Sequence, residues 1–219
     1  YCAGCPHNSS TKLPDGEVVG MGIGCHSISG FLTPDEITNF TQMGGEGAFW
    51  IGRSPFSKHN HSFQNIGDGT YAHSGYLGIR AAVASGVNIT FKILYNGAVA
   101  MTGGQAVEGG QAPWIMSQQL AAEGVVKIAI VTDTLNELSN GTKWANNSQI
   151  YHRRDIIKVQ RELKLIPGVT AIIYIQNCAT ELRRKRKRGM IADKIETIVI
   201  NEKICEGCGD CAVQSNCVA

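Results

Sequence analysis

The chain has 219 residues and a formal net charge of +2, from 20 lysines and arginines against 18 aspartates and glutamates. This near-balance gives no bulk attraction to nucleic acid or to a membrane surface, and no apolar stretch reaches the roughly 18 residues expected of a transmembrane helix. The length suits one core with a small appendage. Since the sequence shows no signal peptide and opens on Tyr1 rather than Met, we expect a cytoplasmic piece of a longer protein.

The N-terminal part predicts short, glycine-rich elements. Residues 1–15 are typical of a loop, and the small apolar residues 18–25 predict a strand that runs into a turn. A Thr-Pro-Asp-Glu sequence at residues 33–36 predicts the start of a helix, because it places a capping hydroxyl, a proline and an acidic residue in their favoured positions. Residues 42–52 form a glycine-rich turn region.

A βαβ unit is expected over residues 63–96. Residues 63–66 are a short apolar lead-in, residues 71–85 carry apolar side chains at helical spacing, and residues 87–95 are rich in strand-forming types. The two strands of such a unit are parallel and joined by a right-handed crossover.

The C-terminal half continues to alternate between helices and strands. The expected elements are a loop at 103–114, a helix at 117–123, a strand at 125–132, a helix at 155–165, and strands at 169–175 and 196–201. Continuous Ile/Val runs indicate strands that are buried on both faces. We therefore predict an α/β fold with a three-layer, mostly parallel sheet.

Gly67-Asp68-Gly69 is the most informative motif. Asp68 lies where a predicted strand passes into a helix, and Asn96 lies 28 positions later at the end of the next strand. A turn with a solvated aspartate is the ordinary explanation for Gly-Asp-Gly, but parallel strand ends meet at one edge of a sheet. A carboxylate and an amide oxygen there suit Mg²⁺, which shares its shell with phosphate, and glycines let a diphosphate approach a helix N-terminus.

This arrangement resembles the diphosphate-binding motif of thiamine-diphosphate enzymes. The resemblance implies that Asp68, Asn96 and the main-chain carbonyl of Ala98 hold Mg²⁺, with Gly67 and Gly69 beside the cofactor.

The downstream motifs resemble 2-oxoacid:ferredoxin oxidoreductases, and in particular the long fused form of the indolepyruvate branch. Matching segments occur in order along the chain. They are Cys2-Ala-Gly-Cys5-Pro-His7, Gly22-Ile-Gly-Cys25, Gly67-Asp-Gly-Thr-Tyr-Ala-His-Ser-Gly75, Met101-Thr-Gly-Gly-Gln105 and Glu206 to Cys217. By this resemblance, the loop of Thr102, Gly103, Gly104 and Gln105 wraps the diphosphate and faces the reacting centre.

The resemblance implies an enzyme that decarboxylates an aryl 2-oxoacid, such as indolepyruvate, oxidatively to an acyl-CoA and reduces ferredoxin. Thiamine diphosphate would supply the carbanion chemistry. In this family, the glutamate that activates thiamine lies on another thiamine-fold domain or subunit. We therefore expect residues 1–200 to be the diphosphate-binding half of the site, and this piece to be inactive alone.

The C-terminal cysteines have the C-x2-C-x2-C spacing of an iron–sulfur ligand set. The set is Cys205, Cys208, Cys211 and Cys217, and it suits a [4Fe-4S] cluster. The gap before Cys217 is longer than in bacterial ferredoxins, and in two-cluster ferredoxins the fourth cysteine of such a run ligates the other cluster. We therefore interpret residues 201–219 as the start of a two-cluster, ferredoxin-like segment. A zinc site is the alternative.

Four further cysteines, Cys2, Cys5, Cys25 and Cys178, are spread through the body of the chain. By the family resemblance they hold a second [4Fe-4S] cluster next to the thiamine. Two alternatives stay open: Cys25 and Cys178 are ordinary buried thiols, or the cysteines form an extracellular disulfide framework.

Three other features each have two interpretations. Residues 43–47, Met-Gly-Gly-Glu-Gly, either place Gly45 and Glu46 against the cofactor or form a tight turn. His26 either faces the substrate or is a satisfied core histidine. The basic run at residues 183–188 is either a solvated loop or a docking site for an acidic ferredoxin or a CoA phosphate.

Two other functions remain for the whole chain. A non-oxidative thiamine-dependent decarboxylase or synthase would leave the cysteines without a role. A non-catalytic zinc or electron-transfer module would leave Asp68 and Asn96 unexplained.

Overall fold

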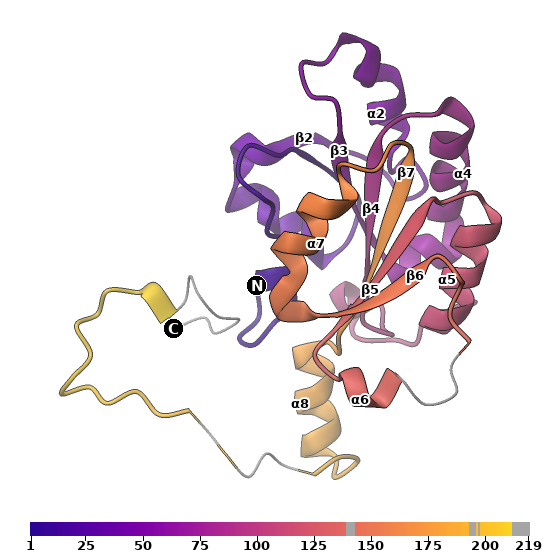
Figure 1. Cartoon of the computed structure of the whole chain (residues 1–219). Coiled ribbons are helices and arrows are strands. Elements are labelled where there is room, and N and C mark those ends of the chain that lie inside the picture. Colours follow the sequence, from indigo (N-terminus) through magenta and orange to yellow (C-terminus); the bar gives the residue numbers. More distant parts are fainter. Residues whose placement is uncertain (139–142, 193–195, 197, 212–219) are drawn as a thin grey trace.

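The computed structural model describes residues 1–138, 143–192, 196 and 198–211. These residues contain one sheet of seven parallel strands in the order β2-β1-β3-β4-β7-β5-β6 (Figure 1). The predicted three-layer α/β fold is confirmed, and the sheet is parallel throughout. The strands are β1 (Val19–Met21), β2 (Ile37–Phe40), β3 (Ser62–Gly67), β4 (Ile89–Tyr95), β5 (Lys127–Thr132), β6 (Ser148–His152) and β7 (Val169–Ile175).

Helices pack on both faces of this sheet. Helices α2, α4 and α5 bury apolar side chains on one face, and α7 does so on the other. The α-helices are α1 (His7–Ser10), α2 (Ala48–Arg53), α3 (Asp68–Thr70), α4 (Tyr76–Ser85), α5 (Pro113–Ala122), α6 (Leu135–Leu138), α7 (Ile156–Leu163) and α8 (Ala179–Lys187). Shorter helical turns are η1 (Cys25–Phe31), η2 (Pro34–Glu36), η3 (Ser54–Phe56), η4 (Tyr71–Gly75), η5 (Ala100–Thr102) and η6 (Arg153–Asp155).

The alternation of side chains along the central strand β4 explains the two cores. Ile89, Phe91 and Ile93 belong to the core beneath α4 and α5, whereas Leu94 belongs to the core beneath α7. Each of these side chains is almost fully buried, which contributes about 1.5–3 kcal/mol apiece. This strand has partners on both sides, β3 and β7, so the carboxyl end of β4 lies in the middle of the sheet edge.

The predicted βαβ unit is confirmed as β3, a continuous helical stretch and β4. The helical stretch begins at Asp68, passes through the π-helical turn η4, and continues as α4 to Ser85. Gly86 ends it in the left-handed conformation, with a φ of 69°.

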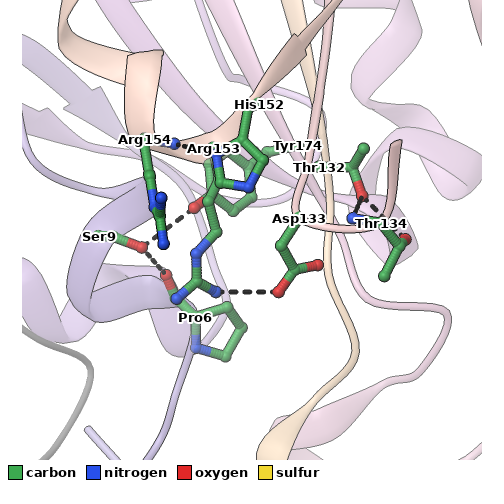
Figure 2. Close-up of polar contacts among 9 residues, drawn as sticks. All are labelled: Pro6, Ser9, Thr132, Asp133, Thr134, His152, Arg153, Arg154 and Tyr174. Atoms are coloured by element: carbon green, nitrogen blue, oxygen red, sulfur yellow. Dashed lines mark hydrogen bonds and ion pairs between the residues drawn. The ribbon is translucent and has the colours of Figure 1, made fainter. Parts of the chain in front are cut away.

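The N-terminal segment contains the short helix α1, which the expectation of a plain loop missed. Its anchors are polar. The Lys12 carbonyl oxygen accepts hydrogen bonds from Lys92 Nζ and Gln160 Nε2, both at 3.1 Å. Figure 2 shows a further anchor at the carboxyl ends of the strands, where Ser9 Oγ lies 3.0 Å from the Tyr174 hydroxyl. These contacts hold the segment against β4, α7 and the carboxyl end of β7.

Two expected elements are wrong. Residues 33–36 form only the single turn η2, because the β-branched and aromatic residues that follow pair with β1 as strand β2, with Val19 opposite Ile37. The described part of residues 196–201 is not a strand. Its side chains lie exposed, with Ile198 at 96%, and no described strand pairs with them.

The basic run at residues 183–188 lies mostly in a helix rather than a loop. Arg, Lys, Leu and Glu all have high helix propensity, and α8 uses them over its nine residues. No helix in the described part of the chain is long and apolar enough to cross a bilayer.

Candidate functional site

Three neighbouring strands, β1, β3 and β4, end at one cavity of about 340 Å³. The segments that follow these strands supply most of its wall. The carboxyl edge of a parallel sheet is where open α/β folds bind ligands. The polar groups in the wall include His7, Cys25, His26, Asp68, Asn96 and Thr102.

Asp68 and Asn96 meet at this edge, as their spacing predicts. Asp68 Oδ2 accepts hydrogen bonds from the backbone N–H groups of Asn96, at 3.1 Å, and Gly97, at 2.7 Å. Its Oδ1 accepts from Gly69 N at 2.9 Å. Asn96 Oδ1 in turn accepts from Ala98 N at 2.9 Å, so the motif and the turn after β4 form one hydrogen-bonded unit.

The electrostatics of Asp68 favour a cation. The side chain is buried, and burial raises the pKa of its carboxyl above the ordinary value, although the backbone donors oppose this. Among the described residues, no lysine or arginine forms an ion pair with it. A divalent cation would supply the missing positive charge, and the carboxylate and amide oxygens are ligands that Mg²⁺ accepts. The donor set therefore fits the predicted metal.

The loop after Asn96 folds back on itself. Val99 and Gln105 form a bridge through Val99 N and the Gln105 carbonyl at 2.8 Å. Gly103 and Gly104 have φ values of 125° and 83°, which a side chain would strain. Thr102 lines the cavity, whereas Gly103, Gly104 and Gln105 do not.

Gly103, Gly104 and Gln105 make contacts outside the cavity. Gln105 Nε2 bonds the Thr102 carbonyl at 3.0 Å, and Arg184 of α8 donates to the Gly103 carbonyl at 2.5 Å. Of the predicted loop, only Thr102 is thus in place to meet a ligand here.

Residues 43–47 place their side chains differently from the expectation. Met43 lines the cavity, but Gly45 and Glu46 do not. Glu46 is completely buried, with Oε2 accepting from Gly44 N at 2.7 Å and Oε1 without a partner among the described residues. Burial raises the pKa of its carboxyl, so Glu46 is a buried acid that does not line the cavity.

Two buried histidines stand in the cavity wall. The rings of His7 and His26 make an edge-to-face contact, with centroids 6.3 Å apart. Burial lowers the pKa of His7 to about 4 and that of His26 to about 3. Both imidazoles are therefore neutral at physiological pH. The sequence did single out His26, but His7 was quoted only as part of a cysteine motif.

The four dispersed cysteines line a second, smaller cavity of about 70 Å³. Cys2 and Cys5 come from the N-terminal segment, Cys25 from the turn after β1, and Cys178 from the start of α8. The wall between the two cavities contains His7, Cys25, Asn96 and Ala100, which line both. The cysteine cavity therefore adjoins the larger one.

The four cysteines line the second cavity without forming a site for a single metal ion among the described residues. No three His, Cys, Asp or Glu side chains of the described residues converge on a single metal ion. An iron–sulfur cubane is wider, because each thiolate binds a different iron atom. Burial raises the pKa of Cys5, a backbone hydrogen bond from His7 opposes this, and the charges of Cys2, Cys25 and Cys178 raise it further. Bound iron would stabilise the thiolates.

The described C-terminal cysteines, Cys205, Cys208 and Cys211, lie exposed, and Cys217 lies outside the described residues. Cys2, Cys5, Cys25, Cys178, Cys205 and Cys208 carry free thiols, so these described cysteines form no disulfide framework.

Several apolar residues that the sequence did not single out complete the larger cavity. They come from the same three strand ends and from the following loops. They are Ile23, Met43, Leu94, Val99, Met101 and Val107. No motif marked them, because isolated apolar residues in loops have no periodicity to read.

Comparison with known proteins agrees with this geometry. The chain is 25% identical over 239 aligned residues to the indolepyruvate oxidoreductase subunit IorA of Thermococcus kodakarensis, covering all of this chain and 35% of that protein. It is 26% identical over 231 residues to the subunit of the same name from Archaeoglobus fulgidus, covering all of this chain and 34% of that protein. The chain thus spans about a third of the length of these curated relatives.

Among solved structures, a 2-oxoglutarate:ferredoxin oxidoreductase from Magnetococcus marinus superimposes with a TM-score of 0.59. The match has 18% sequence identity and covers 82% of this chain and 64% of that one, which supports the fold. The family model for the thiamine pyrophosphate enzyme, C-terminal TPP binding domain, matches residues 22–148. Because that match covers more than half of the chain, from the turn after β1 to the start of β6, the chain belongs to the family of C-terminal TPP binding domains of thiamine pyrophosphate enzymes.

Proposed function

We propose that this chain binds Mg²⁺-thiamine diphosphate as part of an enzyme that oxidatively decarboxylates an aryl 2-oxoacid to an acyl-CoA and passes the electrons to ferredoxin. The observation that carries the proposal is the joining of Asp68 to the turn at Asn96 and Gly97 beside a 340 Å³ cavity. A buried carboxylate with no cationic partner among the described residues suits a metal–diphosphate site.

The roles of the cofactor-binding residues follow from this arrangement. Asp68, Asn96 and the carbonyl of Ala98 would hold Mg²⁺, and Gly67 and Gly69 would lie beside the diphosphate. When bound, thiamine diphosphate supplies the carbanion chemistry. The chain itself would orient the cofactor through Asp68, which is buried at the carboxyl edge of the sheet.

The lining of the cavity supports an apolar substrate side chain. Eight apolar residues border it, the six above together with Ala98 and Ala100, and its described wall contains no lysine or arginine that could pair with a second carboxylate on the substrate. An aryl 2-oxoacid of the indolepyruvate kind places only its oxoacid head among polar groups. The relatives named as indolepyruvate oxidoreductase subunits agree with this substrate class.

The adjoining cysteine cavity supports an oxidative reaction. A [4Fe-4S] cluster on Cys2, Cys5, Cys25 and Cys178 would accept electrons through the shared wall, and a second cluster on the C-terminal cysteines would carry them toward ferredoxin. A non-oxidative thiamine-dependent decarboxylase or synthase would have no use for a set of four thiols at this position. The iron and acid-labile sulfide content of the protein separates the two.

The metal–diphosphate site is tested by calorimetric titration of the chain with thiamine diphosphate in the presence and absence of Mg²⁺. We expect Mg²⁺-dependent binding, and we expect Asp68→Ala to weaken it at least tenfold, because a charged ligand to the metal is lost. Asp133→Ala is a matched control: Asp133 also follows a strand of the sheet, but it pairs with Arg153 at 3.1 Å (Figure 2). Equal affinity of the Asp68→Ala variant and the wild type would refute the site.

A further inference from the structure

His26 is a buried polar side chain in the wall of the larger cavity, and its hydrogen-bonding capacity is unused. The residue is only 2% exposed, and Nε2 has no hydrogen-bond partner among the described residues. Leaving such a group unpaired costs about 1–3 kcal/mol. An unpaired buried group therefore requires an explanation, and a ligand partner is one.

The backbone around the ring is shaped to admit it. A Cβ atom on Gly24 would lie 2.8 Å from His26 Nδ1 and 2.9 Å from Cε1, and Gly24 has a φ of 154° that favours glycine. A Cβ atom on Gly67 would be 3.9 Å from Cε1. The imidazole thus lies against both the turn after β1 and the first glycine of the Gly67-Asp68-Gly69 motif.

Other buried histidines of the chain have a hydroxyl partner. His7 Nδ1 lies 3.2 Å from Ser10 Oγ, and His61 Nε2 lies 2.8 Å from Thr90 Oγ1. The backbone carbonyl of His26 accepts hydrogen bonds from Tyr1 and Ser29, which fixes the residue while Nε2 has no partner in the part of the chain that the structure describes. His61 leaves Nδ1 without a partner but bonds through Nε2, whereas neither ring nitrogen of His26 forms a hydrogen bond with a described residue.

We propose that the imidazole of His26 donates a hydrogen bond to the 2-oxo oxygen of the substrate, while the apolar wall receives the aryl side chain. Negative charge develops on that oxygen when the neighbouring carbon accepts a nucleophile, and an imidazole fixed beside it stabilises the charge. The inference rests on the proposed function and adds a substrate-binding residue to it.

The test uses the full-length polypeptide that carries this chain, with variants His26→Gln and His26→Phe. Glutamine keeps a donor, whereas phenylalanine keeps only size and apolar contact. We expect His26→Phe to lower kcat/KM for an arylpyruvate on the order of 100-fold, mostly through kcat, since the bond strengthens in the transition state. His26→Gln should recover most of the loss, and titration should find Mg²⁺-thiamine diphosphate bound equally by both.

His61→Phe is the control, because it also removes a buried imidazole but lies outside the cavity wall. It should lower thermal stability and leave kcat/KM close to wild type. Unchanged kcat/KM in His26→Phe, or equal loss in the Gln and Phe variants, would overturn the role of His26. If His26→Phe fails to fold, His26→Leu provides the same comparison. Absence of arylpyruvate oxidation by the wild type would overturn the proposed function, and this inference with it.

Discussion

Single residues show where spacing predicts the site and where it does not. Asp68 and Asn96 could be paired from the sequence, because two parallel strands joined by a helix must end at the same sheet edge. The burial of the Lys92 side chain could not be predicted from the sequence. Lys92 lies in a strand that is buried on both faces, where a lysine is not expected. Its side chain is fully buried, 6.0 Å from the Phe63 ring centroid.

Lys92 should make the free energy of unfolding depend on pH. Burial lowers its pKa to about 7 from 10.5, and Glu36 opposes this only partly. Between these values the unfolded chain holds a proton that the folded chain has released, so the free energy of unfolding should rise with pH from about 7 toward 10. Each tenfold change in proton affinity is worth about 1.4 kcal/mol, so the rise should amount to a few kcal/mol.

Urea unfolding of the wild type and Lys92→Met at several pH values measures this rise. The methionine variant should lose it, since the titrating group is gone and its stem still packs. Lys158→Met, at an exposed position on α7, should keep the wild-type slope. A parallel pH profile for wild type and Lys92→Met would show that Lys92 is not the titrating group.

At the scale of elements, apolar periodicity predicted the central part of the fold well. The strand β7 has the predicted bounds, and β3, α4, β4, α5, β5 and α7 lie within a few residues of theirs. The short edge strands β2 and β6 were missed, because three of the four β2 residues and four of the five β6 residues are only partly buried and show little apolar alternation. Helix α8 was missed because a run of charged residues has no apolar face.

The missed helix and the N-terminal segment are the elements that assemble the cysteine cavity. Cys178 precedes α8, and Arg183 of that helix bonds the Ala3 carbonyl at 2.8 Å, between Cys2 and Cys5 in the chain. Tertiary contacts of this kind join positions about 180 residues apart, so the local sequence pattern cannot reveal them. The resemblance of the motifs did suggest that the four cysteines act together, and they do line one cavity.

Iron bound by this cavity should depend on α8 and the turn after β1. Chain purified anaerobically should contain iron and acid-labile sulfide. Cys25→Ser or Cys178→Ser should remove the iron and sulfide bound in the cysteine cavity, because an alcohol is a poor substitute for a thiolate. Cys205→Ser should leave the iron and sulfide of the cysteine cavity unchanged, since Cys205 lies exposed in the C-terminal segment. Zinc in place of iron and sulfide, or titration of every cysteine as a free thiol in metal-free protein, would refute the cluster assignment.

At the scale of the whole molecule, two adjoining cavities lie at one edge of the sheet, on a chain that spans about a third of its curated relatives. The sequence predicted the class of fold and the motif at its centre. It did not predict that Glu46 would be buried away from the larger cavity, because that depends on how residues 43–47 pack against the glycines Gly22 and Gly78.

The chain alone should therefore bind the cofactor without completing a turnover. Thiamine needs a carboxylate to activate its aminopyrimidine, and the described carboxylates in the cavity wall are Asp68, which we assign to the metal, and Glu108, which is exposed on a loop. Supplied with Mg²⁺-thiamine diphosphate, CoA, an arylpyruvate and a viologen dye, the 219-residue chain should not reduce the dye above a blank lacking the oxoacid. The full-length polypeptide should reduce it under the same conditions. Dye reduction by the isolated chain would contradict the expectation that the activating glutamate lies elsewhere, and its loss in a Glu108→Gln variant would then identify Glu108 as that group.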